Sequence, residues 1–213
     1  MAVEIELKLS LPLRSAPRLR RFVSSLGLSS RRQWLVNIYL DTPDLILMQE
    51  KMALRRRQIA RAGEKIWLLT VKTEGVTVDG LSRRAEWEFP MPPELLDFSG
   101  VNDLVLSDRL TQLSPELKPV FRVDFVRQSW NLPGSAIGLD KSNVELALDI
   151  GYISAEKNVR RKAFCELELE LMEGDEKALA IWGERICQEL PELQRQAMSK
   201  AARGYALLFH SRS

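Results

Sequence analysis

The stretch Val3-Glu-Ile-Glu-Leu-Lys-Leu9, near the start of the chain, alternates apolar and charged residues. Successive side chains of a β-strand point to opposite faces, so this stretch predicts a strand with one apolar and one charged face. The charged face would carry Glu4, Glu6 and Lys8. In a single strand, such a face is what a sheet with one side in water presents. The same alternation returns in later strands, and there the signs of the charges become informative.

The rest of the chain predicts seven further strands, bounded by Gly, Pro and Asp turn signals. They span residues 33–41, 52–59, 65–73, 81–89, 119–132, 143–153 and 159–172, with hairpin turns at 62–63 and 154–158. Helical spacing of apolar residues predicts helices over 15–26, 176–190 and 198–209, and shorter ones at 45–48 and 103–113. One domain over residues 1–213, with mostly antiparallel strands and helices outside, is the simplest architecture.

The composition narrows the class of protein. A chain of 213 residues can bury a sizeable core, and its 31 basic and 29 acidic residues give a net charge of +2, which indicates neither a nucleic-acid nor a membrane partner. Cys165 and Cys187 are too few for a disulfide framework or a zinc site. No apolar run has the length of a membrane span, and the first residues lack the layout of a signal peptide. We therefore expect a cytoplasmic protein.

Charges of like sign are concentrated on single strands. Arg55 and Arg57 share one face, Lys72 follows on the next strand, and Cys165-Glu-Leu-Glu-Leu-Glu-Leu171 places three carboxylates on one side. A sheet with its polar face in water would intersperse the two signs, because like charges on neighbouring positions repel. Closing the sheet into a barrel, with charges inside and apolar residues outside under the helices, is the alternative. Charges enclosed in this way have to be paired or bound to a ligand.

The two kinds of charge indicate the class of ligand. A carboxylate cluster favours Mg²⁺ or Mn²⁺, which prefer oxygen ligands, whereas Arg and Lys favour a multiply charged anion of the phosphate type. Both in one cavity predict a metal–polyphosphate complex. Other chemistries lack their motifs: the chain has no Gly-rich phosphate loop, dinucleotide fingerprint or His-Glu-x-x-His. A Ser-His-Asp triad would depend on the sole histidine, His210, which we expect at the surface near the carboxyl end.

Seven short motifs follow one another along the chain. They are Glu4-x-Glu6-x-Lys8, Tyr39-Leu-Asp41-Thr42-Pro43, Leu54-Arg55-Arg56-Arg57, Thr70-Val-Lys72, Arg84-x-Glu86, Glu166-x-Glu168-x-Glu170 and Ser199-Lys200-Ala-Ala-Arg203-Gly-Tyr205. As an ordered set they cover essentially the whole chain and are specific, although each motif alone is not. In this set the chain resembles the CYTH superfamily, the triphosphate tunnel metalloenzymes, and within it the bacterial inorganic triphosphatases.

The resemblance implies an α+β fold built on an eight-stranded antiparallel β-barrel, or tunnel, that hydrolyses inorganic triphosphate to diphosphate and phosphate with Mg²⁺ or Mn²⁺. By motif position, the residues that would bind the phosphates are Lys8, Arg55, Arg57, Lys72, Arg84, Arg127 and Lys200. Those that would bind metal are Glu4, Glu6, Asp149, Glu166, Glu168 and Glu170. The implied catalytic group consists of Glu4, Glu6, Glu168 and Lys8.

Three points depart from the family pattern or leave it open. Arg127 shares its expected strand with Arg122, and a bulge would decide which of them points inward. Arg56 stands where the family usually has an apolar residue, so we expect it on the outer wall or at a rim. Some relatives carry a second, helical domain after this one, whereas this sequence ends at Ser213.

Several alternative functions stay open at this stage. Thiamine-triphosphate hydrolysis, RNA 5′-triphosphate removal and cyclic AMP synthesis from ATP, as by a class IV-type adenylate cyclase, would need the same cations and carboxylates. A base-sized apolar pocket at one tunnel mouth would favour the cyclase. A catalytically silent polyphosphate-binding module is a different class, and the intact carboxylates count against it because anion binding alone needs no metal cluster. The chain could also form a homodimer through apolar patches on its outer strands.

Overall fold

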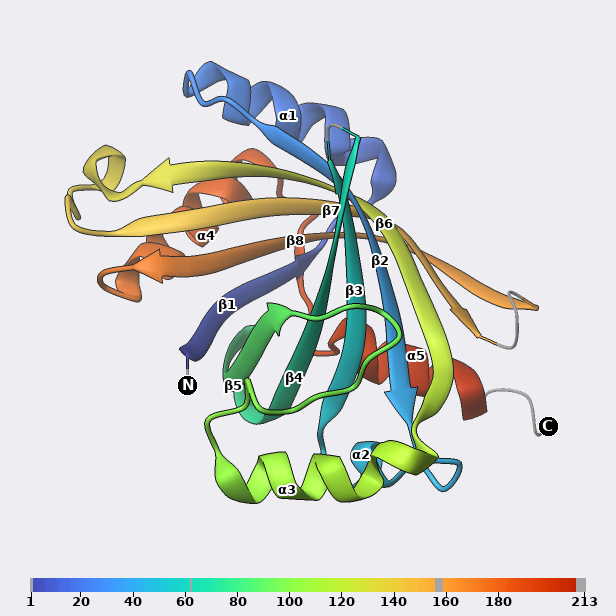
Figure 1. Cartoon of the computed structure of the whole chain (residues 1–213). Helices are drawn as coiled ribbons and strands as arrows, with labels where there is room; N and C mark the ends of the chain where they lie inside the picture. The colour runs from blue at the N-terminus through green and yellow to red at the C-terminus, as the bar shows by residue number, and fades with distance from the viewer. Residues whose placement is uncertain (1, 62, 156–158, 210–213) are drawn as a thin grey trace.

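In the computed structural model, which describes residues 2–61, 63–155 and 159–209, antiparallel strands curve into a closed barrel (Figure 1). The strands are β1 (Ala2–Ser10), β2 (Arg31–Asp41), β3 (Ala53–Arg61), β4 (Glu64–Val78), β5 (Leu81–Pro90), β6 (Lys118–Pro133), β7 (Asn143–Ala155) and β8 (Arg160–Glu173). They pair in the order β5-β4-β3-β2-β6-β7-β8-β1, and β5 also pairs with β1, which closes the barrel. Within the described ranges, this confirms the predicted eight-stranded antiparallel barrel.

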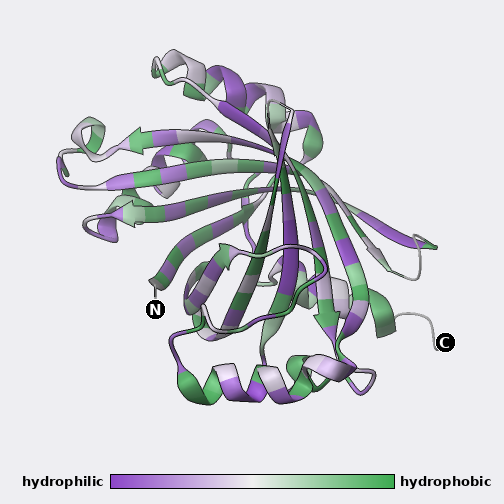
Figure 2. Cartoon of the chain, in the orientation of Figure 1, coloured by the Kyte–Doolittle hydropathy of each residue, from purple (hydrophilic) through white to green (hydrophobic). Residues whose placement is uncertain are grey.

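Helices pack against the outer wall and one end of the barrel. They are α1 (Ala16–Ser25), α2 (Ile46–Gln49), α3 (Leu104–Leu113), α4 (Lys177–Glu189) and α5 (Lys200–Phe209), with short 3₁₀ turns at Leu13–Ser15, Ser114–Glu116 and Gly134–Ile137. Leu19 of α1 and Trp182 of α4 are buried in one apolar cluster with the outward side chains of β1, β6, β7 and β8. Leu110 of α3 lies in a second cluster over β2 to β5. The alternation that this arrangement requires is visible along the strands in Figure 2.

The inner wall is charged over much of its surface and apolar at one end. Tyr39, Arg55 and Thr70 are cross-strand neighbours and therefore face the same side of the sheet. Aromatic and aliphatic side chains of β2, β6, β7 and β8 form a third cluster, in which Tyr205 of α5 is buried. Helix α5 therefore packs across the apolar end of the barrel, next to the charged part of its interior.

The boundaries of the elements agree with the sequence to within a few residues, with three differences. Strand β4 continues to Val78 past a register shift between Lys72 and Gly75, and a two-residue strand, β9 (Gln194–Arg195), pairs with β1. The last helix begins at Lys200 rather than at residue 198. Parts of the two expected hairpin turns, residues 62 and 156–158, lie outside the described residues, as does His210. Among the described helices, none is long and apolar enough to span a membrane.

Candidate functional site

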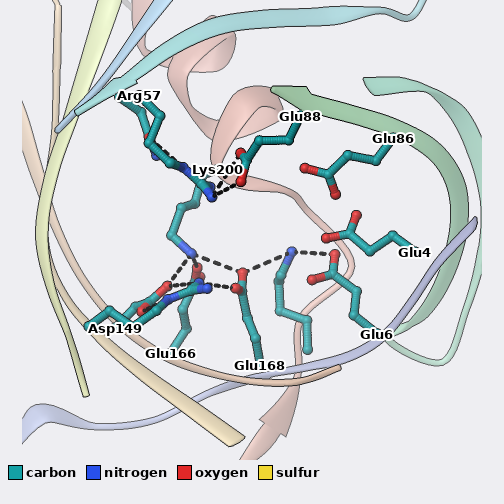
Figure 3. A network of polar contacts seen from close by, with 12 residues as sticks. Glu4, Glu6, Arg57, Glu86, Glu88, Asp149, Glu166, Glu168 and Lys200 are labelled. Atoms are coloured by element: carbon teal, nitrogen blue, oxygen red, sulfur yellow. Dashed lines mark hydrogen bonds and ion pairs between the residues drawn. The ribbon is translucent and has the colours of Figure 1, made fainter. Parts of the chain in front are cut away.

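A cavity of about 870 Å³ lies inside the barrel. Every side chain predicted to bind phosphate lines it: Lys8, Arg55, Arg57, Lys72, Arg84, Arg127 and Lys200. Of the predicted metal ligands, Glu4, Glu6, Glu168 and Glu170 also line the cavity. Asp149 and Glu166 lie behind this lining, with exposed fractions of 0% and 1%. The carboxylates and cations of distant strands therefore converge on one cavity, and Figure 3 shows the labelled side chains pointing toward a common space.

The register of the strands explains this convergence. Glu4 is paired with Arg84 across β1 and β5, and Lys8 is paired with Glu168 across β1 and β8. Because directly paired residues point to the same face of a sheet, the charged faces of these strands have to coincide. The strand from Val3 to Leu9 thus turns its charges into the barrel rather than toward solvent.

One group of charges surrounds the amino group of Lys200, which α5 brings to β7 and β8. The Lys200 Nζ lies 2.7 Å from Asp149 Oδ2 and 2.9 Å from Glu168 Oε1, and it also forms an ion pair with Glu166. The Arg127 guanidinium donates two hydrogen bonds to Asp149, at 2.8 and 2.7 Å. Burial raises the pKa of Asp149, but the adjacent Arg127 and Lys200 outweigh it and hold that pKa below its usual range.

A second group joins β1, β4 and β5. The Lys72 Nζ is 2.8 Å from both carboxylate oxygens of Glu4, and the Arg84 Nε is 2.8 Å from Glu4 Oε2. Arg84 also donates to Glu6, and the Lys8 Nζ lies 3.0 Å from Glu6 Oε1. Burial raises the pKa of Glu4, but the nearby Lys72 and Arg84 lower it by more. The pKa is therefore below its usual value and the carboxyl stays ionised.

A third group contains two carboxylates, Glu86 and Glu88, that are not among the predicted site residues. The Arg57 Nη1 is 3.1 Å from Glu88 Oε2, and the Thr70 hydroxyl donates to the same oxygen at 2.6 Å. The Arg55 Nη2 lies 3.7 Å from both Glu86 and Glu88. Glu86 and Glu88 line the cavity and therefore belong to its charge balance.

Glu170 is where the cavity is short of positive charge. Among the residues that the structure describes, none forms an ion pair with its carboxylate within 4 Å. Burial and the neighbouring carboxylates Glu4 and Glu86 raise the pKa of Glu170 to about 7. A hard divalent cation takes carboxylate oxygens as ligands and would compensate this charge. A divalent metal therefore fits the residues on this side of the cavity.

A further acidic cluster lies beside this one. Carboxylate oxygens of Asp149, Glu166 and Glu168 all lie within 4.8 Å of one another, which is close enough for a shared ion. In the structure these oxygens are occupied by Lys200 and Arg127 instead. The cations and any metal would therefore compete for the same carboxylates.

The structure shows which of Arg122 and Arg127 faces inward and where Arg56 lies. Arg127 points into the cavity, whereas the side chain of Arg122 is 50% exposed and pairs with Asp124. Arg56 is paired with Ile38 and Leu69, which belong to the apolar cluster on the outside of the barrel. Arg56 therefore lies on the outer wall, as expected.

Arg203 belongs to the last of the seven motifs, and it contacts a predicted metal ligand although it is not itself among the predicted site residues. It pairs with Glu166 from α5, and its side chain is 11% exposed. The signal that could have found it is its spacing, because residues three positions apart lie on the same face of a helix. Arg203 stands three positions after Lys200 and reaches the same carboxylate.

Comparisons with known proteins agree with this geometry. The CYTH domain model matches residues 2–205. An inorganic triphosphatase of Haemophilus influenzae is 32% identical over 209 residues, which are 97% of this chain and 55% of that protein, so the chain spans about half the length of this curated relative.

Solved structures share the fold at lower identity. A proposed adenylyl cyclase from Hippeastrum, described as having a dominant triphosphatase activity, superposes with a TM-score of 0.70 at 20% identity, covering 95% of both chains. A protein of Pyrococcus horikoshii OT3 superposes with a TM-score of 0.57 at 18% identity, covering 99% of both. The family match over nearly the whole chain, the related sequence and the shared barrel together show that this chain belongs to the CYTH domain family.

Proposed function

We propose that the chain is a metal-dependent hydrolase that cleaves inorganic triphosphate into diphosphate and phosphate inside the barrel. The observation that supports this most directly is the cavity inside the barrel, which eight Lys and Arg side chains line together with carboxylates from β1, β4, β5 and β8. Such a space suits a small, linear polyanion that carries a divalent cation. The relative from Haemophilus influenzae, which is named an inorganic triphosphatase, favours the same substrate.

The cations of the cavity would hold the phosphates in line. Phosphoryl transfer depends mainly on positioning and on neutralising charge, and Arg can bind a phosphate through two parallel hydrogen bonds. Each of the cations now contacts at least one carboxylate, as Arg57 contacts Glu88 and Lys72 contacts Glu4. Substrate binding would therefore exchange carboxylate partners for phosphate partners rather than bring isolated charges together.

Carboxylates of β1 and β8 would hold the metal. Glu4, Glu6, Glu168 and Glu170 face the cavity, with Asp149 and Glu166 directly behind. Mg²⁺ or Mn²⁺, when bound there, would neutralise phosphate charge and lower the pKa of a water molecule. In the described part of the chain, no histidine lines the cavity. We therefore assign the acceptance of the water proton to the carboxylates of the catalytic group, with Lys8 beside Glu6 and Glu168.

Phosphate release from a panel of substrates tests the proposal. The purified chain should convert triphosphate into equal amounts of diphosphate and phosphate when Mg²⁺ or Mn²⁺ is present, and should stop when a chelator removes the metal. ATP and thiamine triphosphate, tested in parallel, should be poorer substrates. Cyclic AMP formed from ATP at a higher rate would contradict the proposal in favour of a cyclase. Triphosphate binding without any product would contradict it in favour of a binding module.

Arg127 and Arg122 provide a matched pair for the phosphate-binding role. Arg127→Lys keeps the charge but loses the planar fork, so kcat/KM for triphosphate should fall by roughly 10- to 100-fold, the range for one or two charged hydrogen bonds. Arg122→Lys changes the same residue type on the same strand at an exposed position and should leave kcat/KM unchanged. Steady-state kinetics of both variants check this. Equal effects of the two substitutions would count against the assignment of Arg127.

The partner that we propose for this chain is a small-molecule triphosphate, its substrate. Two other expectations from the sequence, the cytoplasmic location and a homodimer, stay predictions.

A further inference from the structure

Asp41, at the end of β2, accepts hydrogen bonds from both local and distant parts of the chain. Its side chain is 0% exposed. The backbone N–H groups of Thr42 and Leu47 donate to Asp41 Oδ1 at 2.8 Å, and that of Met48 donates to Oδ2 at 3.0 Å. The Tyr205 hydroxyl of α5 donates to Oδ2 at 2.8 Å, across 164 positions of sequence. Asp41 therefore connects the end of β2 and helix α2 to helix α5.

Packing around Phe121 aims the Tyr205 hydroxyl at Asp41. The rings of Phe121 and Tyr205 meet edge to face with centroids 5.0 Å apart, and Tyr39 stacks on Phe121 at 4.5 Å. Gly204 permits this close approach, because a Cβ there would lie 2.1 Å from a ring carbon of Phe121. The ring of Tyr205 is thus fixed independently of its hydroxyl, and the hydroxyl adds a directional bond to the contact.

The same helix carries Lys200 into the charged cavity. An α-helix rises about 1.5 Å per residue, so Lys200 stands about 7.5 Å along the axis from Tyr205. The Lys200 side chain is 6% exposed and contacts the three carboxylates of β7 and β8 described above. Because a helix of ten residues moves as one body, a bond that fixes α5 at Tyr205 also fixes the position of the Lys200 amino group.

The Tyr205 hydroxyl is protonated and can therefore donate its hydrogen bond to Asp41 at neutral pH. Burial and the Asp41 carboxylate raise the pKa of Tyr205 above its ordinary value, so the hydroxyl keeps its proton at neutral pH. Hydrogen bonds to an ionised acceptor are roughly twice as strong as neutral ones. Asp41 has no role in the proposed binding of phosphate or metal. Its hydrogen bond with Tyr205 explains why a carboxylate is needed at this position.

We propose that Asp41 and Tyr205 are a positioning pair, whose hydrogen bond holds α5 across the end of the barrel and keeps Lys200 at the carboxylates of the cavity. The placement of Lys200 follows from the structure alone. Its consequence for catalysis rests on the proposed function.

Labelling of lysine amines tests the placement directly. Tyr205→Phe removes the hydroxyl and keeps the ring. Because a bond to a charged group contributes about 1.5–3 kcal/mol, Lys200 should react with an acetylating reagent roughly tenfold faster or more in this variant. Lys8, buried on β1, should react as slowly as before, and the exposed Lys177 serves as the internal reference. Mass spectrometry gives the rate for each lysine. Tyr152→Phe, the same change at a 42% exposed tyrosine of β7, is the matched control.

The outcomes separate a positioning pair from a general stabilising contact. Unchanged labelling of Lys200 in Tyr205→Phe would overturn the proposal, as would a parallel increase at Lys8, which would mean that the whole barrel loosens. In kinetic assays, Tyr205→Phe should lower kcat/KM for triphosphate by about tenfold, whereas Tyr152→Phe should not. A wild-type chain without triphosphate hydrolysis would contradict the proposed function, and the labelling comparison would still decide on the pair.

Discussion

Glu168→Gln is expected to lower the metal-dependent hydrolysis of triphosphate by at least about 100-fold while preserving the fold, since the loss of one group that acts on developing charge costs about that much. Glu168 lines the cavity and contacts three cations that we assign to phosphate binding. It pairs with Arg127, lies 2.9 Å from Lys200 and lies 3.4 Å from Lys8. Gln keeps the shape of the side chain, so the loss would come from the missing charge and metal ligand.

Activity and folding have to be measured together in this variant. Circular dichroism and thermal unfolding should show a folded barrel, and a titration with Mn²⁺ should show weaker activation. Glu176→Gln is the control, because Glu176 is a 48% exposed carboxylate that pairs with Arg83, and neither residue lines the cavity. Near-normal turnover of the Glu168 variant would remove Glu168 from the proposed metal site.

The charged interior was predictable because a strand has a strict period of two. Glu4, Glu6 and Lys8 had to share a face, as did Glu166, Glu168 and Glu170, and the segregation of signs favoured an enclosed face. The register that pairs Lys8 with Glu168 then brings the two faces together. The alternation of side chains along a strand predicts that Arg122 and Arg127 lie on opposite faces of β6. Only the structure shows which of these faces lines the cavity. The pairing of Arg127 with Asp149 decides it.

Contacts that depend on the placement of α5 could not be predicted. Apolar periodicity over 198–209 indicates a helix, but the same apolar face would fit the outer wall or the end of the barrel. The folded chain shows how α5 brings Lys200 to the cavity, Arg203 to Glu166 behind the lining and Tyr205 to Asp41. Strand β9 has two residues and no pattern of its own.

Replacing Lys200 by methionine is expected to abolish hydrolysis and to destabilise the metal-free protein. Burial lowers the pKa of Lys200, but Asp149, Glu166 and Glu168 outweigh it and raise that pKa, so the amino group is charged. Removing one partner of a buried ion pair leaves uncompensated charge, which costs about 3–5 kcal/mol of unfolding free energy. Hydrolysis should fall at least about 100-fold, because a group that stabilises phosphate charge is lost.

The pH dependence of this destabilisation has a definite sign. Asp149 and Glu168 have lowered pKa values in the folded state, so their pairing stabilises the protein above their unfolded pKa values and is lost as the pH falls through the folded ones. Without Lys200 both pKa values should be less depressed. The difference in unfolding free energy between Lys200→Met and wild type should therefore be largest near neutral pH and shrink below about pH 4, where free carboxyls protonate. Urea unfolding at several pH values measures it, with the exposed Lys177→Met as control.

Adding a divalent metal gives a second test of Lys200→Met, in which the stability of the variant should rise. Oxygens of Asp149, Glu166 and Glu168 lie within 4.8 Å of one another, and the Lys200 amino group contacts all three residues. With the amino group removed, a divalent cation is the natural replacement for its charge, because hard cations take carboxylate oxygens. Mn²⁺ should therefore raise the unfolding temperature of Lys200→Met more than that of wild type, although the variant hydrolyses nothing. Equal stabilisation of both proteins by Mn²⁺ would mean that this cluster holds only Lys and Arg, and the metal would then belong to the carboxylates of β1 and Glu170 alone.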